Sequence, residues 1–226
     1  MAKPNKPVAV VVGVGPGLGA ALVRRFAKEG MDVAMAARQA DRLASLVKET
    51  GGKAYGCDAT VETAVDDLFA SVERDSARPS LVVFNAGGYV RKTIAELSVS
   101  DVENTWRNNC LGGFLVGRAA ARAMLQAGSG TIIFTGATAA MRGGANFAAF
   151  AMGKFGLRAL AQSMARELGP RGIHVAHVVI DGGIGESADS TRLAPAAIAD
   201  AYWQLHRQAR SAWTQELDLR PWAEKF

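Results

Sequence analysis

The sequence predicts an α/β protein with a doubly wound parallel sheet of six to seven strands and helices on both faces. Two observations lead to this fold class. Short apolar runs alternate with longer amphipathic stretches as far as about residue 180, a rhythm typical of βαβ units. The runs are apolar at nearly every position, as in strands that are covered on both faces. We expect one domain over residues 1–226, with a loop and tail at about 181–226.

The strands are expected at the apolar runs, each followed by a turn or a helix. A further short segment, residues 215–219, alternates polar and apolar positions as an edge strand does. The six main runs are residues 8–12, 32–36, 53–57, 81–84, 131–135 and 173–180.

The helices are delimited by residues that favour helix ends. Gly30 can take the left-handed conformation at a helix C-terminus, and Ser100 or Asp101 is expected as an N-cap. Gly169 and Pro170 stop a third helix. The expected helices are residues 18–29, 101–126, 146–168 and 195–208.

Composition excludes several functional classes. The formal net charge is +5, but Lys and Arg are scattered rather than gathered into a stripe, so no nucleic-acid partner is expected. Cys57 and Cys110 lie far apart without metal-ligand spacing, so we expect two buried thiols, no disulfide and no metal site. The apolar run at 8–12 is too short for a signal peptide, and no run is long enough to span a membrane. A cytoplasmic protein is expected.

The strongest motif is a glycine-rich turn directly after the first strand. Its sequence is GVGPGLGA, residues 13–20, and it fits both the G-x-G-x-x-A dinucleotide fingerprint and a wider G-x-x-x-G-x-G spacing. Glycines allow close approach to a pyrophosphate, and the following helix presents unpaired N–H groups. This order of strand, turn and helix predicts a Rossmann fold that binds a dinucleotide. The residues expected in the turn site are Gly13, Gly15, Gly17, Leu18 and Gly19.

The end of the second strand indicates which dinucleotide is bound. An acidic residue there would take the ribose hydroxyls of NAD, but this strand ends in Ala36-Ala37-Arg38, with Asp32 at its beginning. Arg38 can form a charge-assisted fork with a 2′-phosphate, although it also fits an ordinary solvated arginine. NADP(H) is therefore the preferred cofactor, with NAD(H) possible.

Further segments, in order and at matching spacings, resemble the short-chain dehydrogenase/reductase family over residues 7–190. The glycine turn matches, although Val12 stands where the family usually has Thr. Asp58 follows the third strand, and Asn109 lies on a helix, as the corresponding family residues do. The triplet after the fourth strand is Asn85, Ala86 and Gly87.

The resemblance implies roles for these residues. Asp58 would lie against the adenine, and the triplet at 85–87 would line the cofactor and steady the sheet. Asn109 would be the helix Asn of the family's catalytic tetrad, and Lys154 would bind the nicotinamide ribose. The residues that follow the sixth strand, including Gly182 and Ile184, would lie near the nicotinamide, although Asp181-Gly182 replaces the usual Pro-Gly pair.

The sequence departs from the family at the two hydroxyls that carry the chemistry. The Tyr-x-x-x-Lys motif reads Phe150-Ala-Met-Gly-Lys154, and Ala137 stands where the family has Ser. Phe150 has no proton to donate to a developing alkoxide. The side chains that might replace it are Thr138, Tyr89, Arg142 and Asn146, and the sequence does not choose among them.

Two hypotheses remain open. In one, the chain is an NADP-dependent oxidoreductase that interconverts a carbonyl and an alcohol with an unusual proton donor or water. In the other, it is a catalytically silent dinucleotide binder with a regulatory or partner-binding role. The small-molecule substrate is unknown in either case.

The sequence also predicts the oligomeric state and the roles of the remaining histidines and tryptophans. The helices at 101–126 and 146–168 are rich in Ala and Gly, which favours close packing in a homodimer or homotetramer. His174 and His177 are expected to be structural. The tryptophans near the C-terminal end are expected to seal the core, with a pocket wall as the alternative: Trp203, Trp213 and Trp222.

Overall fold

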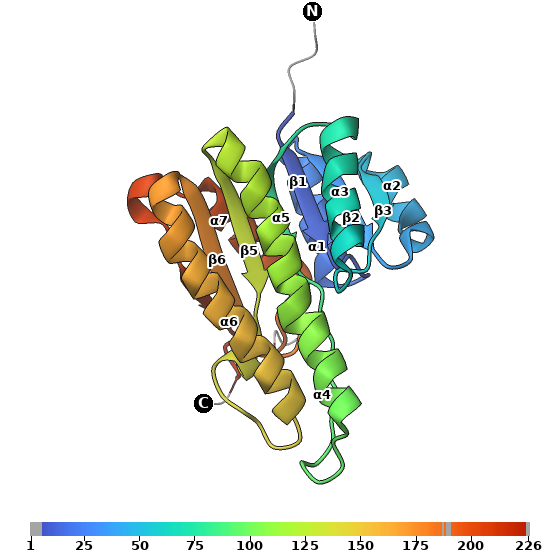
Figure 1. Ribbon diagram of the computed structural model, residues 1–226, viewed down its shortest axis with the longest axis vertical. Helices are drawn as coiled ribbons and strands as arrows, with labels where there is room; N and C mark the ends of the chain where they lie inside the picture. The colour runs from blue at the N-terminus through green and yellow to red at the C-terminus, as the bar shows by residue number, and fades with distance from the viewer. Residues whose placement is uncertain (1–5, 187, 189–190, 225–226) are drawn as a thin grey trace, which may run out of the picture.

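The computed structural model describes residues 6–186, 188 and 191–224, which fold around one parallel sheet (Figure 1). Its seven strands lie in the order β3-β2-β1-β4-β5-β6-β7, and every paired neighbour is parallel. The expected fold class is confirmed, and the expected strands begin and end within two residues of the observed ones. The strands are β1 Val8–Val12, β2 Asp32–Ala37, β3 Lys53–Gly56, β4 Pro79–Phe84, β5 Gly130–Thr135, β6 Ile173–Ile180 and β7 Glu216–Leu219.

The central strands are buried on both faces, which explains why their sequences are continuously apolar. Every residue of β1 and β6 is buried. Alternate side chains enter opposite layers: Val8, Val10 and Val12 join one core cluster, and Ala9 and Val11 join the other. This is the period-two alternation of a strand, acting here between two apolar layers.

Helices cover the two faces in separate groups (Figure 1). The face with Val8 and Val10 is covered by α3, α5 and α6, and the opposite face by α1, α2 and α7. The helices are α1 Leu18–Lys28, α2 Ala44–Thr50, α3 Glu62–Asp75, α4 Val99–Trp106, α5 Gly112–Ala127, α6 Ala148–Leu168 and α7 Pro195–Arg207.

The expected helix at 101–126 differs from the observed one at its start and in its middle. The N-cap is Ser98, not Ser100 or Asp101, because Asp101 occupies the third helical position of a capping box: Ser98 Oγ accepts from Asp101 N, and the Asp101 carboxylate accepts from Ser98 N. The helix is also divided into α4 and α5 by a π-helical turn, Arg107–Leu111. Such turns often occur at functional positions, and this one holds Asn109.

Two residues, Trp222 and Cys110, are less buried than expected. Trp203 is buried and Trp213 stacks on His174 at 5.0 Å between ring centroids, but Trp222 is 79% exposed, so it does not seal the core. Cys57 is buried as expected, whereas Cys110, in the π-helical turn, is only partly buried.

The order of the strands creates the place for a ligand. The chain runs outward from β1 through β2 to β3, and then returns to the other side of β1 with β4. The connections therefore leave in opposite directions at the carboxyl ends of β1 and β4, and doubly wound sheets bind ligands in the crevice at that point. None of the helices within the described residues is long and apolar enough to cross a membrane.

Candidate functional site

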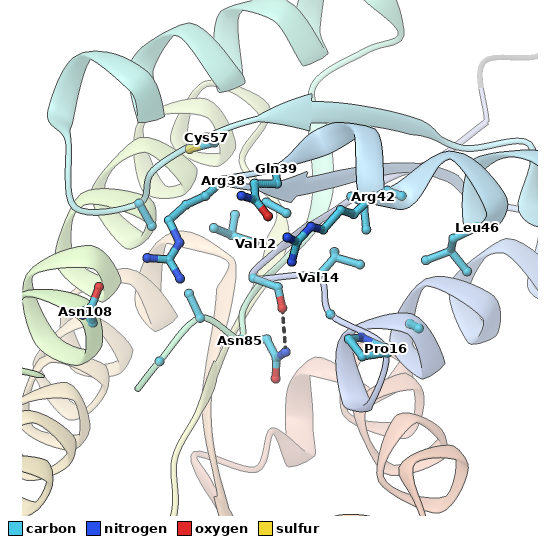
Figure 2. Close-up of a pocket in the computed structure, with 18 of the residues that line it drawn as sticks. Val12, Val14, Pro16, Arg38, Gln39, Arg42, Leu46, Cys57, Asn85 and Asn108 are labelled. Atoms are coloured by element: carbon cyan, nitrogen blue, oxygen red, sulfur yellow. Dashed lines mark hydrogen bonds between the residues drawn. The ribbon is translucent and has the colours of Figure 1, made fainter. Parts of the chain in front are cut away.

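A cavity of about 800 Å³ opens at the carboxyl ends of β1, β2 and β4 (Figure 2). Six predicted cofactor residues line it: the turn residues Gly13 and Gly15, the triplet Asn85, Ala86 and Gly87, and Arg38. The lining residues extend from Val12 to Asn108 along the chain, and the parallel sheet brings their segments to one edge. The other residues that line the cavity are Val12, Val14, Pro16, Ala20, Arg24, Ala37, Gln39, Arg42, Leu43, Ser45, Leu46, Cys57, Ala59, Thr60 and Asn108.

Gly13 makes the turn after β1 possible. Its φ is +93°, and a Cβ at this position would lie 2.3 Å from the backbone N of Ala86, closer than any side chain can stand. The amides of Gly13 and Val14 both donate to the carbonyl of Ala36, at 2.9 and 3.1 Å. The turn is thus fixed by main-chain contacts with β2 and with the segment after β4.

Within the described part of the chain, no side chain caps the N-terminus of α1. Gly17 is the N-cap without a side-chain hydrogen bond, and the first turn carries no acidic residue. A Cβ on Gly15 or Gly17 would have no neighbour within 4 Å, so the backbone is open to a ligand. First-turn N–H groups have no intrahelical partner and attract anions. These residues fit a diphosphate. Leu18 and Gly19 are buried beneath the turn and do not line the cavity.

The Asn85 side chain locks the carbonyl of Gly13. Asn85 Nδ2 donates to Gly13 O at 3.0 Å (Figure 2), and Asn85 Oδ1 accepts from Thr135 Oγ1 at 3.2 Å. The backbone N–H of Asn85 donates to Val12 O at 2.8 Å. Ala86 and Gly87 continue along the cavity wall. The side chain that the resemblance assigned to steadying the sheet therefore joins β1, β4 and β5.

Two arginines place positive charge in the cavity. Arg38 and Arg42 both extend a guanidinium group into it, with Gln39 between them along the wall (Figure 2). Sequence reasoning found Arg38 but missed Arg42, although its position in the short 3₁₀ helix Ala40–Leu43, four residues later, was a usable signal. Arg24 also lines the cavity, but its guanidinium pairs with Glu49 at 2.7 Å.

Asp58 is engaged with its own turn. Its Oδ1 accepts from the backbone N of Thr60 at 2.9 Å and from Thr60 Oγ1 at 2.8 Å. These hydrogen bonds, with the nearby charges of Arg38 and Arg107, hold the pKa of Asp58 below its usual value against the opposing effect of burial. Asp58 itself does not line the cavity, although Cys57, Ala59 and Thr60 around it do.

Asn109 sits in the π-helical turn with half of its amide group satisfied. Its Nδ2 donates to Gly88 O at 2.7 Å and to Thr105 O at 2.8 Å, while its buried Oδ1 has no partner among the residues that the structure describes. A Cβ on Gly87 would stand 2.9 Å from that oxygen. Asn109 therefore fixes the backbone after β4, and its neighbour Asn108 lines the cavity.

Lys154 is a buried amine beside the end of the cavity. Its Nζ donates to Thr135 O at 2.8 Å, and it would lie 3.5 Å from a Cβ on Gly87, which lines the cavity. Burial lowers the pKa of Lys154 to about 8, because removal from water disfavours the charged form. The Phe150 ring centroid lies 5.8 Å from the Nζ atom. Lys154 is therefore not a solvated surface lysine.

An aromatic cluster surrounds the position where the family carries its phenol. The Phe150 ring packs on Tyr89 at 5.7 Å between centroids, and Tyr89 packs on Phe147 at 5.8 Å. Ala137 precedes the short helical turn Thr138–Ala140. Neither position 137 nor position 150 carries a hydroxyl, so the usual pair of polarising groups is missing.

The candidate replacements for these hydroxyls are mostly engaged elsewhere. Thr138 Oγ1 donates to Asp181 Oδ1 at 2.6 Å, and Arg142 lies 3.3 Å from the same oxygen. Arg220 donates to Asp181 Oδ2 at 2.7 Å, so the carboxylate, which is 2% exposed, holds three donors. Tyr89 is largely exposed.

The other residues singled out by the sequence lie outside the cavity lining. Asn146 has a φ of +68° and accepts a hydrogen bond from the backbone N of Lys92. Gly182 and Ile184 lie in the loop after β6. His177 is fully buried, its Nδ1 lies 3.1 Å from Glu216 Oε2, and burial lowers its pKa to about 4, so the ring is neutral at ordinary pH.

Fold and site together define a dinucleotide-binding protein of the Rossmann type, and known proteins give the family. The family model described as "short chain dehydrogenase" matches residues 7–189. This chain belongs to that family. Sorbitol-6-phosphate 2-dehydrogenase of Escherichia coli is 32% identical over 176 residues, which are 74% of this chain and 68% of that protein. D-threitol dehydrogenase of Mycolicibacterium smegmatis is 30% identical over 173 residues, 74% of this chain and 66% of that protein.

Solved structures agree with this assignment over nearly the whole chain. A short-chain dehydrogenase from Rhodopseudomonas palustris is 42% identical, with a TM-score of 0.87 and coverage of 97% of this chain and 100% of that one. A metagenomic short-chain oxidoreductase in complex with NADP is 28% identical, with a TM-score of 0.84 and coverage of 95% and 96%.

Proposed function

We propose that this protein is an oxidoreductase that uses NADP(H) to interconvert a carbonyl and an alcohol. The observation that carries the proposal is the cavity itself. It joins an uncapped helix N-terminus and an open glycine turn to two arginines at its other end. A diphosphate at the turn and a further phosphate at the arginines match that distribution of groups.

The preference for NADP(H) over NAD(H) rests on charge. β2 ends in Ala37 and is followed by Arg38, so no carboxylate stands there to accept the ribose hydroxyls of NAD. Arg38 and Arg42 offer planar donor forks suited to a 2′-phosphate. The metagenomic relative that binds NADP supports the same cofactor class.

When bound, the nicotinamide supplies or accepts the hydride. The chain's own residues have separate tasks. Lys154 offers an ammonium donor to the ribose hydroxyls at the end of the cavity beside Gly87. Asn109 holds the backbone carbonyl of Gly88 and so keeps the wall after β4 in place. The Phe150 ring, whose centroid lies 5.8 Å from the Lys154 Nζ atom, covers one side of that amine.

The proton cannot come from positions 137 and 150, so water or an unusual donor supplies it. Among the candidates, Thr138 donates its hydroxyl hydrogen to Asp181 and Arg142 is drawn to the same carboxylate. This engagement, with the loss of both family hydroxyls, favours the second candidate function, a silent dinucleotide binder. The two functions differ in turnover but share cofactor binding.

Cofactor binding and turnover are measured separately. Titration calorimetry with NADPH and NADH tests the first, and NADPH at about 100 times its dissociation constant should stabilise the fold by about 2.7 kcal/mol. Oxidation of NADPH in the presence of a panel of ketones and aldehydes tests the second. Binding without turnover would leave the silent binder as the function, and an absence of both would refute the proposal.

We also propose that the protein is a homodimer or homotetramer that pairs through α4, α5 and α6. The outer sides of these helices leave large apolar side chains exposed, among them Trp106, Phe114, Met152 and Phe155. Such side chains together on one layer are typical of an interface. Light scattering after gel filtration gives the oligomeric state, and Phe155→Glu should shift it towards the monomer. A wild-type monomer at all concentrations would contradict the proposal.

A further inference from the structure

A chain of hydrogen bonds, buried at Tyr202 and partly buried at Asn85, runs from α7 to the glycine turn. Tyr202 Oη donates to Thr135 Oγ1 at 2.9 Å, and Thr135 Oγ1 donates to Asn85 Oδ1 at 3.2 Å. Asn85 Nδ2 then donates to Gly13 O at 3.0 Å. The last three residues lie at the carboxyl ends of β5, β4 and β1, which are neighbours in the sheet. This series of hydrogen bonds therefore links α7, near the C-terminal end of the sequence, to the glycine turn near the N-terminal end.

The polarity of the chain is fixed by its last member. Gly13 O only accepts, so the NH₂ group of Asn85 must face it and the amide oxygen must face Thr135. Thr135 then donates its only hydroxyl hydrogen to Asn85, which leaves its lone pairs for Tyr202. Tyr202 is fully buried, so no water replaces a missing partner. Each group is needed in one orientation, and hydrogen bonds in such a series strengthen one another.

The carbonyl at the end of the chain controls the turn that faces the ligand. Gly13 O belongs to the same peptide group as the Val14 N–H, which donates to Ala36 O at 3.1 Å. Asn85 and Ala36 thus hold the two sides of this one peptide plane. If the Asn85 amide loses its orientation, the plane is held from one side only, and the turn before α1 is less well fixed.

Thr135 also forms a hydrogen bond with Lys154. Its main-chain carbonyl accepts the hydrogen bond from Lys154 Nζ at 2.8 Å. The side chain of Thr135 therefore acts towards the glycine turn, and its main chain acts towards the buried amine. A second contact ties α7 to α1, because Arg25 in the last turn of α1 pairs with Asp200 of α7 at 2.6 Å.

We propose that Tyr202 is a positioning residue for the cofactor turn, acting through Thr135 and Asn85 on the carbonyl of Gly13. The inference rests on the proposed cofactor site. It also means that cofactor binding and the seating of α7 are coupled, since whatever fixes one end of the chain favours the ordered arrangement at the other. α7 follows the loop after β6, so the coupling extends to the segment in which the substrate loop is expected.

The test compares the affinity for NADPH in variants that remove or keep single hydroxyls. Tyr202→Phe should weaken NADPH binding about 5-fold, as expected for one lost hydrogen bond. Thr135→Val should weaken it about 10-fold or more, because it leaves both neighbours unpaired. Thr135→Ser keeps the hydroxyl and should restore the affinity to within about 2-fold of wild type. The double variant Tyr202→Phe/Thr135→Val should bind no worse than Thr135→Val alone.

The matched control is Tyr55→Phe. Tyr55 donates to Asp75 Oδ2 at 3.1 Å, so its loss removes the hydrogen bond of another tyrosine without removing any member of the series from Tyr202 to Gly13. Hydrogen exchange supplies a readout beyond affinity. NADPH should slow exchange of the α7 amides in wild type and in Tyr55→Phe, and should do so much less in Tyr202→Phe.

The outcomes separate the inference from the function on which it rests. If wild type binds NADPH and Tyr202→Phe and Thr135→Val bind it equally well, the positioning role is overturned while the cofactor site stands. An equal loss in Tyr55→Phe would reduce the effect to general destabilisation and overturn it too. If wild type binds neither NADPH nor NADH, the proposed function fails and the inference falls with it.

Discussion

The two ends of the candidate site are built from different kinds of groups. The cofactor end consists largely of main chain: the Gly13 and Val14 amides, the open backbone at Gly15, and the uncapped N-terminus of α1. The end expected to hold the substrate depends on side chains, and there the family hydroxyls are replaced by Ala137 and Phe150. The first end is an open glycine turn, whereas positions 137 and 150 of the second end carry no hydroxyl.

This difference shows that a single substitution can remove a proton donor but not a binding site made of main chain. A backbone site survives changes of side chain as long as the chain can follow the same path. A proton donor is one functional group on one residue, and replacing tyrosine with phenylalanine deletes it while almost preserving the shape. The fold of the family therefore preserves the cofactor cavity more reliably than it preserves the proton donor.

The largest expected effect comes from restoring the lost groups. Phe150→Tyr with Ala137→Ser should raise NADPH-dependent ketone reduction about 10²–10⁴-fold, because a positioned acid contributes that much to the rate. Initial rates of NADPH oxidation measure it. Ile94→Tyr, at a position that is 78% exposed and outside the cavity lining, is the control and should change nothing. Without any gain, the substrate end has diverged in more than two hydroxyls.

The second prediction breaks the cofactor end. Gly13→Ala should lower the free energy of unfolding by about 4 kcal/mol and abolish NADPH binding, because its Cβ would overlap the backbone at Ala86. Urea denaturation and calorimetry measure the two effects. Gly15→Ala has space for its Cβ and should weaken binding while leaving stability within about 1 kcal/mol. Equal stability of both variants would contradict the described turn.

The third prediction concerns pH and the lysine between the two ends. The folded protein releases the Lys154 proton at about pH 8, whereas the unfolded chain keeps it to about 10.5. Between these values the unfolded state binds more protons, so stability should rise with pH by up to about 3 kcal/mol. Below pH 8 the buried charge is a constant cost.

Other groups titrate in the same range with the opposite sign, so the measurement is a difference. Burial raises the pKa of the Cys57 thiol to about 11, which makes stability fall as pH rises above 9. The unfolding free energies of wild type and Lys154→Met should therefore be compared in urea from pH 7 to 10.5. As the pH rises across this window, the unfolding free energy of wild type should increase relative to that of Lys154→Met. A constant difference would place the Lys154 pKa at its ordinary value.

The smallest expected effect concerns the preference of the cofactor end for NADPH over NADH. Arg38→Ala and Arg42→Ala should each weaken NADPH binding about 10-fold and leave NADH binding within about 2-fold, because only NADPH carries the phosphate they would contact. Calorimetry with both nucleotides measures the ratio. Arg24→Ala, whose guanidinium already pairs with Glu49, is the control. Equal losses for NADPH and NADH would assign the arginines to the diphosphate instead.

The sequence by itself determined the fold class, the strands and the cofactor turn. Continuous apolar runs separated by helices leave few other arrangements, and the position of Gly13 directly after β1 assigns the turn. The loss of the two hydroxyls is also legible, since a fixed spacing from Lys154 identifies Phe150 and Ala137. These features depend on local chain geometry and spacing, which a sequence carries directly.

Only the tertiary structure decided which groups meet. It brought Arg42 into the cavity beside Arg38 and turned the Asp58 carboxylate towards Thr60. It also committed Thr138 to Asp181 and joined Tyr202 to the glycine turn through Thr135. The physical reason is that these partners come from strands and helices far apart in the chain. Their meeting depends on side-chain packing and hydrogen-bond direction across the sheet, which local patterns do not encode.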